Sequence, residues 1–106
     1  MIRSVLYLRP RRARHTEVVD FYRRHGVLER AVAQEGCLGA ELQLPTSGSG
    51  EVLVTALWRD ADAYRGWLEN PAREQNAAEL ERLLDGFDAG VSGDTYEVVL
   101  DAEPRS

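Results

Sequence analysis

Segment 52–68 constrains the fold of this chain more than any other part of the sequence. Up to Trp58 nearly every residue is aliphatic, so both alternating sets of side chains are apolar apart from one threonine. A strand with two apolar faces is usually buried on both of them. Two residues later, Asp60 is a suitable N-cap for a helix that carries Tyr64 and Trp67. The segment therefore predicts a buried strand that turns sharply into a helix, with large aromatic side chains gathered at the corner.

Apolar periodicity, bounded by glycine and proline, predicts the remaining strands and helices. Pro10 closes the first strand, Gly36 follows the first helical region in the C′ position, and Pro71 interrupts the second region. Thr16 is the expected N-cap of the first helical region, and Gly26 is an expected kink within it. The expected strands are residues 2–9, 38–44, 51–59 and 96–100, and the expected helical regions are 16–35 and 60–84.

Each helical region has one apolar stripe that we expect to face the sheet, because its members recur at steps of three and four residues. The first stripe consists of Val18, Phe21, Tyr22, His25, Leu28 and Val32. The second consists of Ala77, Leu80, Leu83 and Leu84. The loop before the last strand is expected to contain Gly86, Gly90 and Gly93.

The order of elements, β-α-β-β-α-β, is typical of the ferredoxin-like α+β fold, an antiparallel sheet with its helices on one face. The helices cover one face of strand 51–59, and its other apolar face needs a different cover. We therefore expect a homodimer in which two open sheet faces meet. Residues 1–100 are expected to form one domain, and residues 101–106 a short polar C-terminal tail.

Composition excludes several classes of function. The chain has 106 residues and a formal net charge of −5, so binding of nucleic acid through a general basic field is not expected. No apolar run approaches the length of about 18 residues that spans a membrane, and no signal peptide is recognisable; we expect no membrane partner and a cytoplasmic location. Cys37 is the single cysteine, and His15 and His25 have no companion ligands at metal-binding spacing, so no metal site is expected.

Several short sequences resemble the antibiotic biosynthesis monooxygenase domain family. They are Glu-Gly-Cys-Leu-Gly at 35–39 before a strand, the strand that ends in Trp58, Asp-Ala-Tyr at 62–64, and Pro71 shortly after Trp67. The resemblance covers about residues 2–100. It implies a dimeric α+β barrel. Members of the resembling family include cofactor-free oxygenases of aromatic polyketides, quinol monooxygenases and haem-degrading enzymes.

The leading hypothesis from this resemblance is a cofactor-independent monooxygenase. It would oxidise an aromatic phenol, anthrone or quinol-type metabolite with O₂, in aromatic polyketide or antibiotic biosynthesis, and would need no cofactor. In the polyketide oxygenases an asparagine before the family tryptophan holds an oxyanion; this chain has Val54 there. In the haem-degrading branch an axial histidine follows the helical tryptophan by about ten residues, where this chain has Asn76 and Ala77.

Seven residues are candidates for the site. His25 would act as a base because imidazole titrates near neutral pH, Tyr22 and Tyr64 would bond a phenolic substrate, and Arg73 would face a carboxylate or enolate. Aromatic residues would form the walls. The catalytic candidates are His25, Tyr64 and Arg73, and the substrate-binding candidates are Tyr22, Trp58, Trp67 and Asn76.

Alternatives remain open at this stage. A polyketide cyclase or isomerase would need the pocket and a base but no oxygen. A non-catalytic dimer that binds a ligand or haem is favoured by Val54 and Ala77, which occupy the positions of the relatives' reactive groups. His25 could also be a satisfied helix histidine, and Arg73 could pair with Glu69 or Glu74 at the surface.

Overall fold

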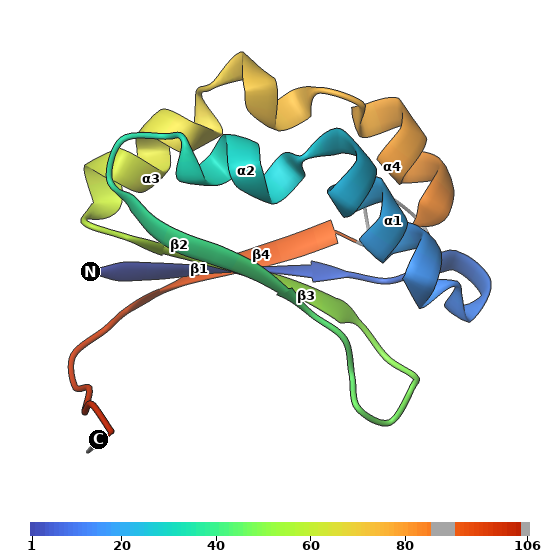
Figure 1. Ribbon diagram of the computed structural model, residues 1–106, viewed down its shortest axis with the longest axis horizontal. Helices are drawn as coiled ribbons and strands as arrows, with labels where there is room; N and C mark the ends of the chain where they lie inside the picture. Colours follow the sequence, from blue (N-terminus) through green and yellow to red (C-terminus); the bar gives the residue numbers. More distant parts are fainter. Residues whose placement is uncertain (86–90, 105–106) are drawn as a thin grey trace.

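The computed structural model describes residues 1–85 and 91–104, and it contains a four-stranded antiparallel sheet with every described helix on one face (Figure 1). The ferredoxin-like α+β prediction is confirmed, and the sheet of the single chain is open, not closed into a barrel. The elements in chain order are β1 (Ile2–Leu8), η1 (Arg11–Ala13), α1 (His15–His25), α2 (Val27–Val32), β2 (Cys37–Gln43), β3 (Val52–Trp58), α3 (Ala61–Leu68), η2 (Pro71–Glu74), α4 (Ala77–Leu83) and β4 (Val91–Glu97).

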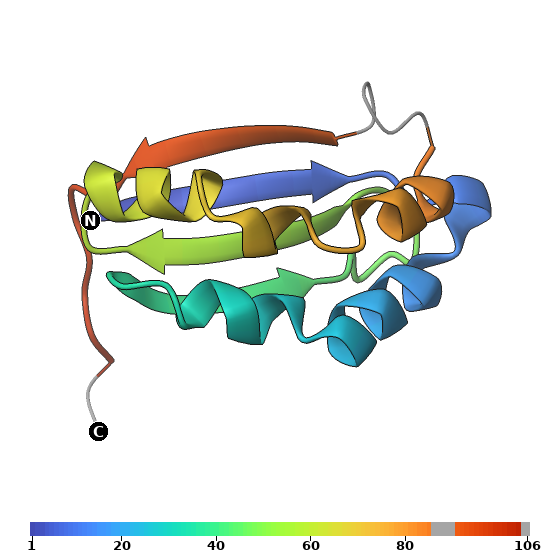
Figure 2. The same cartoon turned by 90° about the horizontal axis from the view of Figure 1, so that it is seen from above.

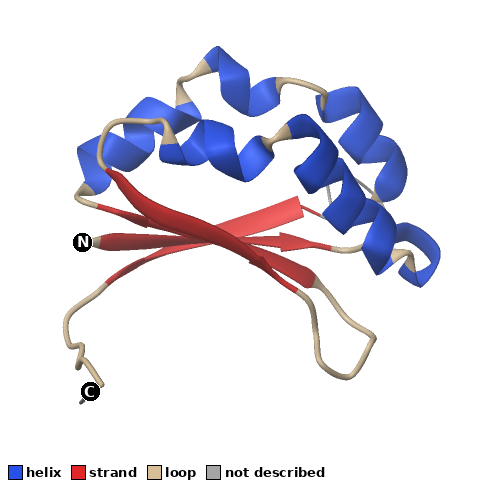
Figure 3. Ribbon diagram, in the orientation of Figure 1, coloured by secondary structure: helices blue, strands red, loops and turns tan. Residues whose placement is uncertain are grey.

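The strands are arranged in the order β2-β3-β1-β4, so the doubly apolar strand β3 is one of the two central strands. All neighbouring strands are antiparallel, and Trp58 at the end of β3 lies opposite Ile2 of β1. Seen from above, α1 and α2 form a row along the β2 side of the sheet, while α3, η2 and α4 form a second row over the central strands (Figure 2). The helix layer and the strand layer are separate, and no helix of the described residues lies on the lower face of the sheet (Figure 3).

The first helical region is two helices, not one. Gly26 has φ 59°, in the left-handed region, and it is both the C-cap of α1 and the residue before α2. This left-handed residue changes the direction in which the second helix presents its side chains. Ala31 is therefore buried at 7% exposure, while Val32 is 45% exposed, and the prediction that Val32 faces the sheet is wrong.

The predicted N-cap at Thr16 is also wrong. Helix α1 begins at His15, and its N-terminus has no side-chain cap. The N-cap position is Arg14, two residues before Thr16, and the turn that leads into it contains Arg12 and Ala13, both with positive φ. The ring nitrogens of His15 lie 3.0 Å from the carbonyl oxygen of Ala13 and 2.7 Å from that of Gly50, so this helix start is anchored to the loop before β3.

The second helical region is divided more than the sequence predicts. Asn70 accepts a hydrogen bond of 2.9 Å from the Ala72 backbone, and this cap starts the short turn η2. Gln75 is extended and Asn76 has φ 65°, so α4 begins only at Ala77 and the predicted continuous helix over 72–84 is wrong. Leu84 is buried but lies outside the helix, bridged to Pro10.

The last strand begins earlier than predicted. Strand β4 covers Val91–Glu97, not 96–100, because its bounds follow its pairing along the whole length of β1. Gly93, which was expected in the loop, pairs with Leu6 inside the strand. The expected loop residues Gly86 and Gly90 lie outside the described residues.

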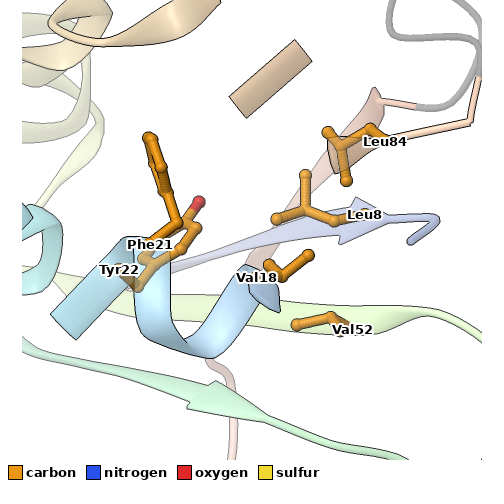
Figure 4. Packing of buried hydrophobic residues seen from close by; sticks show 6 residues of the cluster. All are labelled: Leu8, Val18, Phe21, Tyr22, Val52 and Leu84. Carbon is orange, nitrogen blue, oxygen red and sulfur yellow. The ribbon is translucent and has the colours of Figure 1, made fainter. Parts of the chain in front are cut away.

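Two clusters of buried side chains form the core between the sheet and the helices. One lies at the Leu8 end of β1, where side chains from α1 pack against the strands (Figure 4). The other lies at the opposite end, around Trp58. The first consists of Leu8, Val18, Phe21, Tyr22, Val52 and Leu84, and the second of Ala31, Ala56, Trp58, Ala63 and Trp67.

Candidate functional site

A cavity of about 880 Å³ lies between the helices and the sheet and is lined by residues of both core clusters. A volume of this size is within the range of ligand pockets in proteins. Side chains from both helix rows and from the helix-facing side of the sheet contribute to its wall. Of the seven candidates, the structure brings together five around this cavity: Tyr22, Trp58, Tyr64, Trp67 and Arg73.

The aromatic corner predicted from segment 52–68 forms one end of the cavity. The ring centroids of Trp58 and Tyr64 are 5.6 Å apart, and the rings of Trp58 and Trp67 are stacked at 6.5 Å. Trp58 is 1% exposed and Trp67 is 9% exposed, so both are packed as well as adjacent to the cavity. These distances are typical of aromatic pairs, and the three rings make a rigid apolar wall suited to a flat aromatic ligand.

The helix that follows β3 is positioned by a local cap, as predicted. The carboxylate of Asp60 accepts a hydrogen bond of 2.8 Å from the backbone N–H of Ala63. This hydrogen bond is the main cause that lowers the pKa of Asp60 below its usual range. The charged cap fixes the start of α3 at Ala61, three residues after the strand ends at Trp58, which is why Tyr64 and Trp67 lie so near Trp58.

Tyr22 contributes a hydroxyl that stays protonated at neutral pH. Its side chain is 6% exposed, and burial raises the pKa of Tyr22 to about 12, although the nearby positive charge of Arg73 acts in the opposite direction. Burial has this effect because the phenolate form loses its hydration. Tyr22 is therefore suited to donate a hydrogen bond to a ligand rather than to remove a proton from it.

Arg73 lines the cavity from η2 and remains exposed to solvent. None of the salt bridges among the described residues includes it, so the expected alternative of pairing with Glu69 or Glu74 is not observed there. Its charge is close enough to Tyr22 to influence the pKa of that hydroxyl. Arg73 therefore brings a positive charge, and Tyr22 a hydroxyl donor, to the same side of the cavity.

His25 and Asn76 are not among the residues that line the cavity. The Nε2 atom of His25 lies 3.2 Å from a carboxylate oxygen of Glu79 on α4, and its ring packs against Phe21 at 4.8 Å. Arg24 donates to the other oxygen of the same carboxylate at 2.5 Å. Asn76 is exposed, and its backbone carbonyl accepts hydrogen bonds from the first turn of α4.

The two positions that differ from the resembling family both lie in the cavity wall. Val54 is on the helix-facing side of β3, and Ala77 is the first residue of α4. Neither side chain has a polar atom. At these positions the wall can contribute shape and apolar contact, but no hydrogen bond from a side chain.

Sequence reasoning missed one cationic residue of the wall, Arg30 of α2. The stripe of the first helical region did not include it, because that stripe assumed a continuous helix through Gly26. With Gly26 in the left-handed conformation, Ala31 is buried and its neighbour Arg30 contacts the cavity. A glycine inside a helical pattern was the signal available, since such a residue often ends one helix and redirects the next.

Within residues 1–85 and 91–104, no helix is both long enough and apolar enough to span a bilayer. The same residues contain no group of three or more histidine, cysteine, aspartate or glutamate side chains arranged to hold a metal ion.

Comparison with known proteins identifies a family and several similar structures. The sequence model of the family described as antibiotic biosynthesis monooxygenase matches residues 1–87. No curated protein matches the chain significantly. A provisionally assigned antibiotic biosynthesis monooxygenase from Deinococcus radiodurans has a TM-score of 0.75 and 19% identity, with 100% of both chains covered.

Two further solved structures are similar over nearly their whole length. Rv0793 from Mycobacterium tuberculosis has a TM-score of 0.73 and 17% identity, covering 96% of this chain and 98% of that one. SnoaB, a cofactor-independent oxygenase from Streptomyces nogalater, has a TM-score of 0.73 and 17% identity, covering 94% of each chain. At such identities the similarity to these structures establishes a common fold alone.

Proposed function

Because the chain belongs to the antibiotic biosynthesis monooxygenase family, we propose that it is a cofactor-independent monooxygenase of an electron-rich aromatic metabolite. A monooxygenase-type role follows from the family. The proposed substrate is a phenol, an anthrone or a quinol, the proposed setting is aromatic polyketide or antibiotic biosynthesis, and the proposed location is the cytoplasm. The observation that carries the proposal is the cavity with a stacked tryptophan wall and a cationic, hydroxyl-bearing side.

The cavity supports this substrate class through its shape and its apolar wall. The Trp58, Tyr64 and Trp67 rings offer a flat surface for a fused or single aromatic ring. SnoaB, which has the same fold, is described as working without a cofactor. We extend that property to this chain as part of the proposal.

The proposed reaction takes its electrons from the substrate. An anthrone-type methylene loses a proton to give an enolate carbanion, which transfers one electron to O₂. The resulting radical and superoxide combine to form a C–O bond, and protonation gives a hydroperoxide. Loss of water from the hydroperoxide leaves a ketone, so one oxygen atom enters the product and the other leaves as water.

The cavity residues have roles that fit these steps. Arg73 would stabilise the enolate, because an adjacent positive charge favours the ionised form of an acid. Tyr22 would donate a hydrogen bond to the peroxide or enolate oxygen, since its hydroxyl is protonated at neutral pH. Tyr64 would orient the ring against Trp58. His25 remains a predicted base, and its action would require the ligand to reach the region of Glu79.

Oxygen consumption tests the proposal. Purified protein is mixed with an anthrone and with a hydroquinone, and O₂ uptake is measured against buffer. We expect uptake above buffer for at least one compound, and Arg73→Gln should lower kcat/KM by about tenfold or more, since it removes a charge that stabilises the developing anion. Arg82→Gln, an exposed change on α4 outside the cavity, is the matched control. No uptake above buffer across the panel would reject the oxygenase.

The second candidate function is a protein that binds an aromatic ligand without oxidising it, either without catalysis or as a cyclase. It is favoured by Val54 and Ala77 in the cavity wall, which replace the reactive groups of the resembling branches. A protein without catalytic activity would bind aromatic ligands with no O₂ uptake, and a cyclase would change its substrate without O₂ uptake. Addition of haemin would produce a Soret shift if the chain binds haem. These readouts separate the alternatives in one set of preparations.

We propose that the chain forms a homodimer through the open face of the sheet. Along each strand, side chains alternate between the helix-facing side, where Trp58 lies, and this open face. The open face includes Val5 of β1 and Leu53 and Leu57 of β3, which are partly buried in the single chain. An uncovered apolar sheet face is a usual site of association. Thr55 lies on the same face and is already buried in the single chain, where its hydroxyl accepts a hydrogen bond of 2.8 Å from the side chain of Gln43.

A further inference from the structure

Arg30 has an unusual position for an arginine, because it lines the cavity while its guanidinium group is largely buried and has few partners. Its Nη1 atom donates to the backbone carbonyl of His25. Its Nε and Nη2 atoms are excluded from solvent and have no hydrogen-bond acceptor among the described residues. Arg30 also takes part in none of the salt bridges formed by those residues. The described chain thus leaves half of this cation unsatisfied.

An arrangement of this kind is unfavourable unless an acceptor is supplied. Arginine stays protonated in proteins, so the group cannot become neutral to relieve the cost. Buried donors without partners are rare in native structures, and each one calls for an explanation. Arg30 lines the cavity, so a ligand there supplies the acceptor once the side chain turns to bring Nε and Nη2 to the cavity surface.

The chemistry of the two unpaired atoms indicates what that acceptor is. Nε and Nη2 lie on the same edge of the guanidinium plane, and their N–H groups point in parallel. This edge matches the two oxygens of a carboxylate, which it binds through two parallel hydrogen bonds. A phenolate or enolate has a single oxygen and would satisfy the edge less completely.

The neighbourhood of Arg30 adds to the preference for an anion. Helix α2, which carries Arg30, packs against η2, which carries Arg73, and both arginines line the cavity. The protein has a formal net charge of −5, so this pair of cations is a local feature and not part of a general basic surface. Glu74, the acidic residue that η2 contributes to the wall, forms no salt bridge with either arginine among the described residues.

We propose that Arg30 is a specificity-determining residue that binds a carboxylate of the ligand, so that the cavity takes an aromatic acid. The ring of the acid lies against the Trp58 wall and its carboxylate receives the Nε and Nη2 hydrogen bonds. This inference names a substrate class for the proposed oxygenase. It rests on that proposed function only where it calls the bound acid a substrate, since binding of the acid does not require the reaction.

Calorimetric titration with a matched pair of ligands tests the proposal. The probes are 1-hydroxy-2-naphthoate and its neutral amide, which have nearly the same shape, at pH 7.5. We expect the wild-type protein to bind the acid at least about tenfold more tightly than the amide, because a hydrogen-bonded charge pair contributes more than a neutral one. Arg30→Gln should remove this preference and leave amide binding nearly unchanged.

The controls separate a specific role from a structural one. Arg82→Gln removes a charge from an exposed position on α4 and should keep the wild-type preference for the acid. Arg30→Lys keeps the charge without the two-pronged edge, and we expect it to lose most of the preference; it also decides the question if Arg30→Gln does not fold. An unchanged preference in the folded Arg30 variants, or a wild-type protein that binds the amide as well as the acid or binds neither, would overturn the proposal.

The same titration is independent of the oxygenase reaction, because binding is measured without turnover. Acid-selective binding that depends on Arg30, with no O₂ uptake on any substrate, would support this inference while rejecting the proposed function. Oxygen uptake without acid selectivity would do the reverse.

Discussion

The indole Nε1 atom of Trp58 donates a hydrogen bond of 2.9 Å to the hydroxyl oxygen of Ser4 on the neighbouring strand β1. The donor of this tryptophan is therefore satisfied within the protein, and its ring is available to a ligand as an apolar surface. Trp58 is 1% exposed, so its side chain joins the core to the cavity wall. The bond also fixes the ring plane against which Tyr64 and Trp67 pack.

Replacement of Ser4 by alanine should destabilise the protein, because it leaves the buried indole N–H without its partner. We expect a loss of about 1–3 kcal/mol in the free energy of unfolding, measured with urea. Trp58→Phe removes the other half of the bond. In a double-mutant cycle the two changes should show a coupling of about 1 kcal/mol. Strict additivity of the two losses would contradict a role for this bond.

The buried hydroxyl of Tyr22 should make stability depend on pH in the alkaline range. The pKa of this group is about 12 in the folded protein and 10.0 in an ordinary tyrosine, so the unfolded chain releases the proton first as pH rises. The stabilising contribution is complete below pH 10 and is lost as pH rises towards 12, by about 2–3 kcal/mol at most.

Urea unfolding of the wild-type protein and Tyr22→Phe at several pH values between 9 and 11.5 measures this effect. The wild-type protein should lose stability faster than the variant as pH rises. Parallel curves for the two proteins would show that Tyr22 titrates normally.

The close approach of Gly36 to Ala63 predicts a costly substitution. Gly36 has φ 86°, and a Cβ atom at this position would lie 2.5 Å from the Cβ atom of Ala63. Gly48 has a similar φ of 83° but has open space around it. Both Gly→Ala changes strain the backbone, whereas only Gly36→Ala also forces α3 away, so it should cost at least about 1 kcal/mol more. Equal losses of thermal stability for the two variants would argue against tight packing at this point.

The corner at Trp58 could be predicted from the sequence because its determinants are local. Alternation of apolar residues predicts the strand, and the Asp60 cap acts on a backbone group only three residues away. Neither needs information from a distant part of the chain. The same is true of the kink at Gly26, although its consequence for the next helix was not foreseen.

The parts of the site that were missed depend on tertiary structure. Arg30 reaches the cavity because a single left-handed residue reorients α2, and the stripe pattern cannot express such a rotation. His25 pairs with Glu79, a residue 54 positions away in the sequence, so its place outside the cavity lining follows from how α1 and α4 pack. The bounds of β4 follow from its pairing with β1, which overrides the glycine that suggested a loop.

The link from α1 to Glu79 should hold α4 in place over the cavity in a pH-dependent way. Loss of hydration acts to raise the pKa of Glu79, but the hydrogen bonds from His25 and Arg24 outweigh it and the pKa is lowered overall. The contribution of Glu79 to stability is therefore present above its unfolded value of 4.5 and is lost as pH falls through the lower folded value.

Thermal unfolding of Glu79→Gln and the wild-type protein at pH 7 and at acidic pH measures this link. The variant should be less stable at pH 7, and the difference should shrink as pH falls below 4.5. Glu81→Gln, an exposed change on the same helix, is the control.

His25→Gln tests separately whether this histidine takes part in the reaction. If His25 is a general base, its replacement should lower kcat by at least about a hundredfold. If His25 only holds α4 in place, its replacement should lower stability with a small effect on kcat.

The open sheet face predicts how the dimer can be separated. Leu53 lies on this face opposite Tyr7 of β1 and Gln43 of β2, and Leu53→Arg would place a charge in the middle of the proposed interface. Burial of an unpaired charge opposes association. Light scattering should therefore give the mass of two chains for the wild-type protein and of one chain for the variant, with an unchanged circular dichroism spectrum. Val32→Arg, on the exposed side of α2, is the control and should remain dimeric. A monomeric wild-type protein would exclude the dimer. A Leu53→Arg variant that stays dimeric would place the interface elsewhere.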